Sequence, residues 1–347
     1  MAFFMRFIYI CGMQIKFSII VPVYNRPDEV EELLQSITAQ TYKEDFEVVI
    51  VEDGSSIPAK SIIEKYRDKL NITYFFKENS GPGDSRNYGM KRAKGNYYLI
   101  FDSDCILPSQ YLTEVSKALK KQYVDCFGGP DAAHNSFTTI QKAISYAMTA
   151  FLTTGGIRGG KKAVNKFQPR SFNMGISKEV FEKTQGFGQI HPGEDPDLTI
   201  RIWKAGYETI LISEAFVYHK RRISWEKFHI QVNKFGMVRP ILNLWHPETA
   251  KLTYWFPTVF CIGILLSIGF SIFLGFHWFL IAYGVYFSAI LLDALRTTKS
   301  IKIAFLAMLA VCIQFYGYGV GFLKSTIALK IFKQNPLERF PQLFFKK

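Results

Sequence analysis

Two short acidic clusters in the sequence have the residue types and spacing for catalysis. Asp102 and Asp104 follow an apolar run at 97–101, with one residue between them. Two carboxylates that leave a buried strand together can hold an oxygen-preferring divalent cation. Such a cation bridges a diphosphate and stabilises the charge that develops on a leaving group. The alternative is a solvated turn, because Asp-Ser-Asp is a common loop composition.

The second cluster, Glu194-Asp195-Pro196-Asp197, stands at the start of a predicted helix. Asp and Glu in this position often cap a helix and compensate its dipole. A carboxylate there can also act as a general base towards an acceptor hydroxyl. We expect both uses, with Asp197 as the cap and Asp195 as the base.

Three further residues could contact a ligand. Arg86 follows a glycine-rich loop at 80–83, and His219 ends an apolar run with Arg222 three residues later. An arginine can bind phosphate through its planar guanidinium, although Arg222 could equally be a charge beside a membrane. A lone histidine is more often a packed or surface residue than a ligand.

Strand and helix signals alternate through the first hundred residues. Apolar, strand-like runs occur at 17–24, 46–51, 72–76 and 97–101, and helical patterns between them at 29–40, 59–69 and 84–93. This alternation predicts an α/β fold with a mostly parallel sheet. The carboxyl ends of such strands form the ligand crevice. Because Tyr24, Asp53 and Asp102 fall at these ends, they are candidate site residues.

The pattern is weaker after residue 124, and the stretch 128–168 resists assignment. Clear patterns occur again after residue 170. The sequence predicts a strand at 171–176, a helix at 178–184 and a second helix that ends at 204. It then predicts strands at 209–212 and 215–218 and an amphipathic surface helix at 224–235.

The last third of the chain is strongly apolar and predicts a membrane region. Apolar segments occur at 255–276, 278–292 and 303–323. A helix needs about 20 residues to cross a bilayer, so the first and third are long enough and the second is marginal. A buried helical hairpin in a soluble protein is the alternative. We expect an N-terminal extension at 1–16, an α/β domain at 17–240 and a membrane domain at 241–347 with two to three transmembrane helices and a basic tail.

Charge and cysteine content narrow the class of protein. The formal net charge is +13, and basic residues crowd around the apolar segments, which favours an anionic membrane leaflet. Nucleic-acid binding is disfavoured because these clusters border apolar spans and form no recognised binding motif. Five cysteines without paired or metal-ligand spacing indicate a reduced, cytosolic compartment. We therefore expect a multi-pass membrane protein, in a bacterial inner membrane, with a cytosolic α/β domain.

Five motifs in order and spacing resemble family 2 glycosyltransferases of the GT-A fold. They are Ser-Ile-Ile-Val-Pro-Val-Tyr-Asn at 18–25, Glu-Asp-Gly-Ser at 52–55, Ser-Arg-Asn-Tyr-Gly at 85–89, Phe-Asp-Ser-Asp at 101–104 and Gly-Glu-Asp-Pro-Asp-Leu at 193–198. One such motif alone would be weak, whereas five in register are specific. The resemblance covers about 17–236.

The resemblance implies a role for each matching residue. Pro22, Tyr24 and Asp53 would hold the nucleoside base of a nucleotide sugar, with Arg86 nearby and Asp102 near the ribose. Asp104 would bind Mg²⁺ or Mn²⁺, with His219 as a further ligand and Arg222 on the pyrophosphate. Asp195 would be the base of a single displacement that inverts the anomeric carbon.

One departure separates the chain from the processive polysaccharide synthases, which it also resembles. These carry Gln-x-x-Arg-Trp after the Glu-Asp motif, whereas the comparable stretch here has Lys234 and Phe235. Lysine lacks the planar fork of arginine, and phenylalanine lacks the indole of tryptophan. The motif of the processive enzymes is therefore absent from this stretch, which favours transfer of single sugars.

The sequence therefore predicts a glycosyltransferase that uses a nucleotide sugar, with UDP favoured over GDP by the resemblance. We expect the acceptor to be membrane-associated or lipid-linked, in the assembly of a surface polysaccharide or glycoconjugate. The alternatives are a processive synthase, a non-catalytic membrane scaffold with a degenerate transferase domain, and a nucleotidyltransferase. The last is disfavoured because its Gly-rich basic loop is missing.

Overall fold

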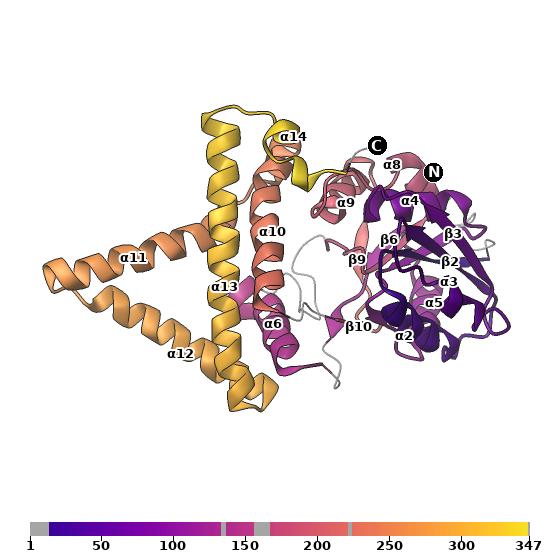
Figure 1. The fold of residues 1–347 in the computed structure, drawn as a ribbon, viewed down its shortest axis with the longest axis horizontal. Helices are drawn as coiled ribbons and strands as arrows, with labels where there is room; N and C mark the ends of the chain where they lie inside the picture. The colour runs from indigo at the N-terminus through magenta and orange to yellow at the C-terminus, as the bar shows by residue number, and fades with distance from the viewer. Residues whose placement is uncertain (1–13, 133–136, 156–166, 221–223, 346–347) are drawn as a thin grey trace. The chain divides into compact units, whose positions relative to one another are not determined.

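The structure is a computed structural model that describes residues 14–132, 137–155, 167–220 and 224–345. It divides into two compact units, which we call the sheet unit and the helical unit. The sheet unit comprises Met1–Ala132, Lys161–His219 and Phe345–Lys347, and the helical unit comprises Ala133–Gly160 and Lys220–Phe344. Figure 1 shows the elements of both.

A seven-stranded sheet forms the centre of the sheet unit. Its order is β3-β2-β1-β4-β8-β6-β9. The strands are β1 (Phe17–Val23), β2 (Phe46–Asp53), β3 (Ile72–Lys77), β4 (Tyr97–Phe101), β6 (Cys126–Gly128), β8 (Asn173–Ser177) and β9 (Thr209–Leu211). All neighbours are parallel except β8, which is antiparallel to both β4 and β6. The predicted α/β fold with a mostly parallel sheet is confirmed.

Helices cover both faces of this sheet, because successive side chains of a strand point to opposite faces. In β1, Ile19 packs in one apolar core and Ile20 in the other. The first core takes in α2 (Pro27–Thr38), α3 (Lys60–Glu64) and α5 (Tyr111–Lys121); the second takes in α4 (Pro82–Arg92), α8 (Lys178–Thr184) and α9 (Glu194–Lys204). Helix α3 is much shorter than the predicted 59–69, since the chain continues in turns after Glu64.

A small second sheet joins segments that are far apart in the sequence. Its order is β5-β10-β7, with β5 at Cys105–Ile106, β7 at Asp131–Ala132 and β10 at Val217–His219. Strand β10 is antiparallel to β5, and the register sets His219 opposite Cys105. This pairing brings a late histidine beside the acidic residues that follow β4.

The helical unit contains the apolar segments together with three helices that precede them. Its elements are α6 (Thr139–Thr149), α7 (Phe151–Thr154), α10 (Trp225–Trp245), η1 (Pro247–Thr249), η2 (Leu252–Trp255), α11 (Phe256–Leu274), α12 (Trp278–Thr298), α13 (Ile301–Thr326), η3 (Ile327–Ile331), α14 (Pro336–Arg339) and η4 (Pro341–Leu343). The sequence-based domains assign α6, α7 and the first part of α10 to residues 17–240, whereas packing places them with the apolar helices. The domain boundaries themselves stay a prediction.

Two of these helices extend six or more residues beyond their predicted ends. Helix α10 runs to Trp245 rather than ending near 235, and α12 runs to Thr298 rather than ending at 292. Charge at Asp293 and Arg296 ends the apolar run of α12 but not the helix, which stops only where Lys299 adopts a left-handed conformation.

Glycines allow α13 to approach its neighbours closely. A Cβ on Gly321 would lie 2.3 Å from the Asn233 carbonyl of α10, and one on Gly319 would lie 2.9 Å from the Pro257 carbonyl of α11. The Asn233 side chain donates to the Gly317 carbonyl (2.9 Å). Small residues and interhelical hydrogen bonds of this kind hold helices together where lipid surrounds them.

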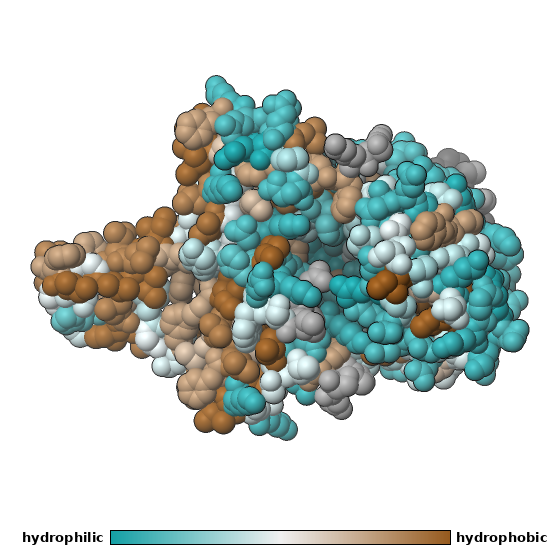
Figure 2. Space-filling view, in the orientation of Figure 1, coloured by the Kyte–Doolittle hydropathy of each residue, from teal (hydrophilic) through white to brown (hydrophobic). Residues whose placement is uncertain are grey.

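Three helical stretches are long and apolar enough to cross a membrane, by length and composition: Leu252–Leu274, Trp278–Thr298 and Ile301–Ile331. In α11 the buried residues are the polar Thr258 and Ser267, while large apolar side chains such as Leu265 and Phe273 are exposed. The apolar surface of α11 and α12 is visible in Figure 2. A helix that buries its hydroxyls and exposes its apolar side chains suits a lipid environment.

Candidate functional site

Asp53 lies at the carboxyl end of β2, and its buried carboxylate organises the loop before α4. Oδ1 accepts hydrogen bonds from Lys77 Nζ (2.5 Å) and the Ser80 amide (3.0 Å), and Oδ2 accepts one from the Gly81 amide (2.9 Å). A carboxylate has about four lone-pair sites, so Oδ2 can accept a further donor. Asp53 therefore supports the glycine-rich loop and retains the capacity to bind a ligand.

The end of β1 lies against the loop that follows β2. Pro22 is opposite Val51 in the parallel register, and Tyr24 is 53% exposed just beyond the strand. The Asn25 amide donates to Ser55 Oγ (2.8 Å), which ties the two loops together. Pro22 and Asp53 thus lie in the last residues of the adjacent strands β1 and β2, and Tyr24 directly follows β1, so all three are at the carboxyl ends of these strands.

Arg86 joins the two acidic clusters that the sequence singles out. Its guanidinium, 2% exposed, donates from Nη2 to Asp102 Oδ1 (2.6 Å) and from Nη1 to Glu194 Oε1 (3.3 Å), and it lies over the Phe187 ring. Since α4 carries Arg86 and begins at the loop held by Asp53, one element links the strand ends to α9. Arg86 acts here as a buried cross-link.

Glu194 is a site residue that the sequence analysis did not single out by itself. It is buried and bonds both Arg86 and His191 Nδ1 (2.9 Å). Burial opposes its ionisation, but the charges of His191 and Arg86 hold the pKa of Glu194 well below its usual range. Burial would lower the pKa of His191, but contact with Glu194 raises it. Glu194 is therefore a fixed negative charge beside Asp195.

Asp195 has the properties of a general base. Burial and the neighbouring Glu194 charge raise the pKa of Asp195 to about 6, against the lowering effects of Arg86, Arg170 and a hydrogen bond with Ser171. Its Oδ1 is buried and has no hydrogen-bond partner in the described part of the chain. A raised pKa and an unused oxygen are what proton abstraction near neutral pH requires.

The expectation that Asp197 caps α9 is wrong. Gly193 is the N-cap residue, and it has no side chain with which to cap the helix. The Asp197 carboxylate instead accepts from Arg201 Nε (2.9 Å) and Nη2 (2.8 Å). Arg201, one turn further along the helix, binds the Asp197 carboxylate, so this carboxylate is not available to cap the helix.

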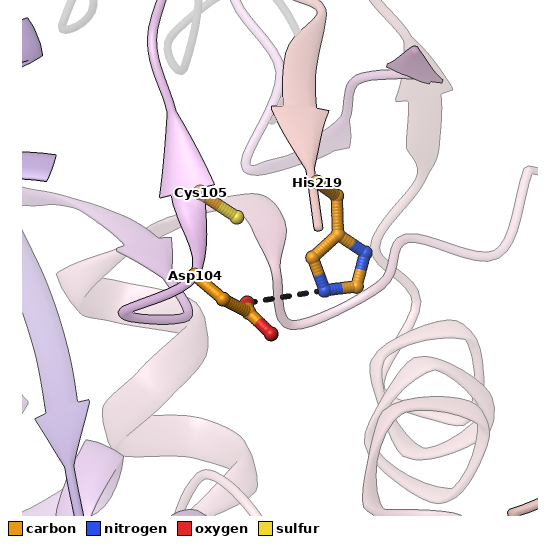
Figure 3. A group of neighbouring side chains, drawn as sticks. All are labelled: Asp104, Cys105 and His219. Carbon is orange, nitrogen blue, oxygen red and sulfur yellow. Dashed lines mark ion pairs between the residues drawn. The ribbon is translucent and has the colours of Figure 1, made fainter. Parts of the chain in front are cut away.

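Asp104 and His219 form a second group, shown in Figure 3 with Cys105. Asp104 Oδ1 lies 3.2 Å from His219 Nε2, and the ligand atoms of the three residues lie within 4.8 Å of one another. The His219 ring stacks on Phe172, and its buried Nδ1 lacks a hydrogen-bond partner among the described residues.

The chemistry of this group fits a cation held by Asp104 and His219. Burial raises the pKa of the Cys105 thiol far above its usual value, and its Sγ donates to the Phe172 carbonyl (3.3 Å). A neutral thiol is a poor metal ligand because the thiolate is the binding form. The carboxylate and the imidazole are therefore the available ligands.

The two carboxylates of the Asp-Ser-Asp turn have different partners. Asp102 pairs with Arg86, whereas Asp104 pairs with His219. Arg222, the remaining candidate, lies outside the described residues.

Phe345 also belongs to the sheet unit, although its position in the sequence gave no sign of this. Its amide donates to the Gln189 carbonyl (3.1 Å), its ring lies 5.8 Å from that of His191, and a Cβ on Gly81 would lie 2.3 Å from it. Because Phe345 is far from these contact residues in the sequence, no local sequence pattern predicts the contacts.

Arg86→Met is expected to lower the free energy of unfolding by about 3–5 kcal/mol, because it leaves two carboxylates near a buried site without their cation. Urea unfolding of the full chain in detergent micelles measures this. Arg201→Met, the control, removes a more exposed ion pair with Asp197 and two hydrogen bonds to the Thr184 and Gly186 carbonyls, so the loss should be smaller, about 2 kcal/mol. Equal losses would contradict a special role for the Arg86 pairs.

Comparisons with known proteins show which proteins the chain is similar to. Residues 18–184 match the sequence model of the family described as Glycosyl transferase family 2. TarS of Staphylococcus aureus, a poly(ribitol-phosphate) beta-N-acetylglucosaminyltransferase, is 38% identical over 113 residues, which are 32% of this chain and 20% of that protein. An uncharacterized glycosyltransferase of Rickettsia typhi is 47% identical over 87 residues, which are 25% of this chain and 26% of that protein. The matches thus span a fifth to a quarter of the length of these relatives.

Two further proteins are similar over most of the chain. Glycosyltransferase AglE of Haloferax volcanii is 25% identical over 260 residues, which are 73% of this chain and 80% of that protein. The mannosyltransferase PcManGT from Pyrobaculum calidifontis, solved with GDP-Man and Mn²⁺, has a TM-score of 0.55 and 18% identity and covers 94% of this chain and 89% of its own. At this identity the likeness concerns the fold.

Proposed function

We propose that the protein is an inverting glycosyltransferase that uses a nucleotide sugar, because residues 18–184 match the sequence model of Glycosyl transferase family 2. A UDP-sugar is the proposed donor, and a membrane-associated or lipid-linked molecule the proposed acceptor. The observation that carries the proposal is Asp195, a carboxylate beside the Arg86–Glu194 pair with a raised pKa and an oxygen that has no hydrogen-bond partner among the residues the structure describes.

In this reaction the acceptor hydroxyl attacks the anomeric carbon of the donor. Asp195 takes the hydroxyl proton as the new carbon–oxygen bond forms, and the bond to the nucleotide diphosphate breaks. Attack from the face opposite the leaving group inverts the anomeric carbon. Burial and the Glu194 charge raise the proton affinity of Asp195, and the Arg86 charge lowers it.

The donor's nucleoside is assigned to the strand ends of β1, β2 and β4. Pro22, Tyr24 and Asp53 would contact the base, and Asp102, held by Arg86, would face the ribose. Arg222 would approach the pyrophosphate. Asp104 and His219 would hold a Mg²⁺ or Mn²⁺ ion, which when bound would offset negative charge on the leaving diphosphate.

The helical unit is the basis for the proposed acceptor class. Three helical stretches long and apolar enough to cross a membrane would keep the enzyme where lipid-linked acceptors reside. We propose that the sheet unit is cytosolic, since nucleotide sugars are charged and soluble, and that the product enters a surface polysaccharide or glycoconjugate.

The test is a panel of nucleotide sugars offered with Mn²⁺ to membranes that contain the protein. We expect one sugar nucleotide to release its nucleotide diphosphate when membrane lipids are present, with label incorporated into an organic-extractable product carrying one sugar. A long polymer made from the donor alone would indicate a processive synthase. No release from any donor, together with no binding of nucleotide diphosphate, would refute the enzyme and support the scaffold.

A further inference from the structure

A cavity of about 220 Å³ lies within the helical unit, between the end of α10, the η1–η2 segment and the end of α13. Its lining residues are Pro240, Asn243, Ala250, Lys251, Leu252, Trp255, Phe322, Thr326 and Lys330. One water molecule needs only about 10–15 Å³ of such space. The cavity can therefore hold a polar group much larger than water.

The cavity lies where two of the membrane-span candidates end. Lys251 and Leu252 stand at the beginning of one membrane-span candidate, Leu252–Leu274, and Lys330 at the end of another, Ile301–Ile331. These two ends meet at the same edge of the helical unit because all three residues line one cavity. Lysine and tryptophan are typical of the boundary between hydrocarbon and water, and Trp255 is the aromatic residue here.

The lining combines aromatic rings with cationic side chains. The rings of Trp255 and Phe322 meet edge to face with centroids 5.0 Å apart. Lys251 and Lys330 add two positive charges, and neither takes part in an ion pair with a described residue. An ammonium group without a protein carboxylate is available to an anion.

Two buried polar atoms of the lining also lack partners in the described part of the chain. Thr326, 7% exposed, has a buried Oγ1 without a hydrogen bond, and so does Asn243 at Oδ1. Leaving a buried polar group unpaired costs about 1–3 kcal/mol. A ligand that offers both acceptors and donors would remove this cost, since a hydroxyl can donate to it and an amide oxygen can accept.

From these observations we propose that the cavity binds the phosphate headgroup of an anionic lipid. The two lysines pair with the phosphate, the Thr326 hydroxyl donates to it, and the Trp255 and Phe322 rings contact the glycerol and upper acyl carbons. The site is distinct from the Asp195 and Asp104 groups of the sheet unit. The inference does not depend on the proposed transferase reaction, and the bound lipid need not be its acceptor.

The experiment is a lipid titration of the purified full chain in detergent, followed by native mass spectrometry. The probes are dioleoyl phosphatidic acid and, for comparison, zwitterionic dioleoyl phosphatidylcholine. We expect the wild type to retain one phosphatidic acid in preference to phosphatidylcholine. The double variant Lys251→Gln, Lys330→Gln should raise the Kd for phosphatidic acid by about 10- to 30-fold, given the usual contribution of a basic residue near a lipid surface.

A matched double variant distinguishes binding in the cavity from general attraction of an anionic lipid to a positively charged protein surface. Lys299→Gln with Lys302→Gln removes the same charge at the opposite end of α13 and should leave the Kd within about twofold of wild type. If it raises the Kd as much as the cavity variant does, the lipid binds through diffuse charge and the proposal is wrong.

A second, uncharged pair keeps the test valid if the lysine variant folds poorly. Thr326→Val keeps the side-chain shape and should weaken phosphatidic acid binding about three- to tenfold. Ser325→Ala is its control, because Ser325 is buried, its Oγ has no hydrogen-bond partner within the described ranges, and it does not line the cavity. Unchanged binding in Thr326→Val would overturn the assigned contact.

The source of the phosphate is tested by competition with inorganic phosphate. We expect inorganic phosphate not to displace the lipid, even when the phosphate concentration is well above the Kd for phosphatidic acid. The reason is that the ring contacts add to the binding of the lipid but not to that of free phosphate. Displacement of the lipid by inorganic phosphate, with the same losses in the variants, would show a site for free phosphate and overturn the lipid assignment.

Discussion

Asp195→Asn is expected to lower kcat by about 10³-fold, with KM for the donor changed little. An amide cannot take the acceptor's proton, and general base catalysis contributes about 10²–10⁴ in rate. The substitution keeps the shape of the side chain, so donor binding by the strand ends should persist. The measurement is initial-rate release of nucleotide diphosphate, with Asp197→Asn as the control.

Asp197 is a suitable control because it lies in the same helical turn and its carboxylate is bonded to Arg201. We expect Asp197→Asn to retain kcat within a fewfold of wild type even if it melts at a lower temperature. Full activity in Asp195→Asn would remove Asp195 from the role of base.

Asp195→Asn should also stabilise the folded state at neutral pH. The pKa of Asp195 is raised to about 6 by burial and by Glu194, above the value of 3.8 for an unhindered Asp. A carboxyl whose pKa is higher in the folded state destabilises that state when ionised, and this cost disappears as the pH falls below the folded pKa. The neutral amide in Asp195→Asn carries no such cost, so the free energy of unfolding at pH 7.5 should rise, by up to about 3 kcal/mol.

The pH dependence of the wild-type rate should also report the ionisation of Asp195. As the pH falls below about 6, Asp195 becomes protonated and kcat should fall up to tenfold per pH unit. Glu194 stays ionised over this range because its pKa is well below the usual value. The small residual rate of Asp195→Asn should lack this inflection; an identical inflection in the variant would assign it to another group.

Asp104→Ala is expected to abolish the dependence of the rate on added Mn²⁺ and to lower kcat by at least about 10²-fold. The variant leaves His219 without its carboxylate partner and removes the only oxygen ligand of the Asp104–Cys105–His219 group. An oxygen-preferring cation cannot be held by an imidazole alone. Mn²⁺ binding, measured directly by the loss of the free-ion electron paramagnetic resonance signal, gives a readout that does not require activity.

Cys105→Ala is the matched control for this cation site. Because the Cys105 thiol is neutral and bonded to the Phe172 carbonyl, its removal should leave the Mn²⁺ affinity within about threefold. A loss as large as that in Asp104→Ala would indicate a sulfur ligand, and with it a softer metal than Mg²⁺ or Mn²⁺.

The sequence by itself determined the features that depend on local burial. The apolar runs at β1, β2, β3 and β4 predicted buried strands, and the acidic residues Asp53 and Asp102 were correctly located at their ends. The alternation of strand and helix predicted a mostly parallel sheet, which is confirmed. The three apolar segments correspond to the three span candidates. Such features are readable because a buried strand or span must be apolar along its own length.

The tertiary structure alone decided which distant groups meet. Arg86 contacts Glu194, 108 residues away, and His219 reaches Asp104 only because β10 pairs with β5. Strand β8 enters the sheet antiparallel between β4 and β6, and α6 packs with the apolar helices. Each of these contacts closes a long loop, so its free energy depends on the packing of the whole chain. No local pattern of residue types records that choice of partner.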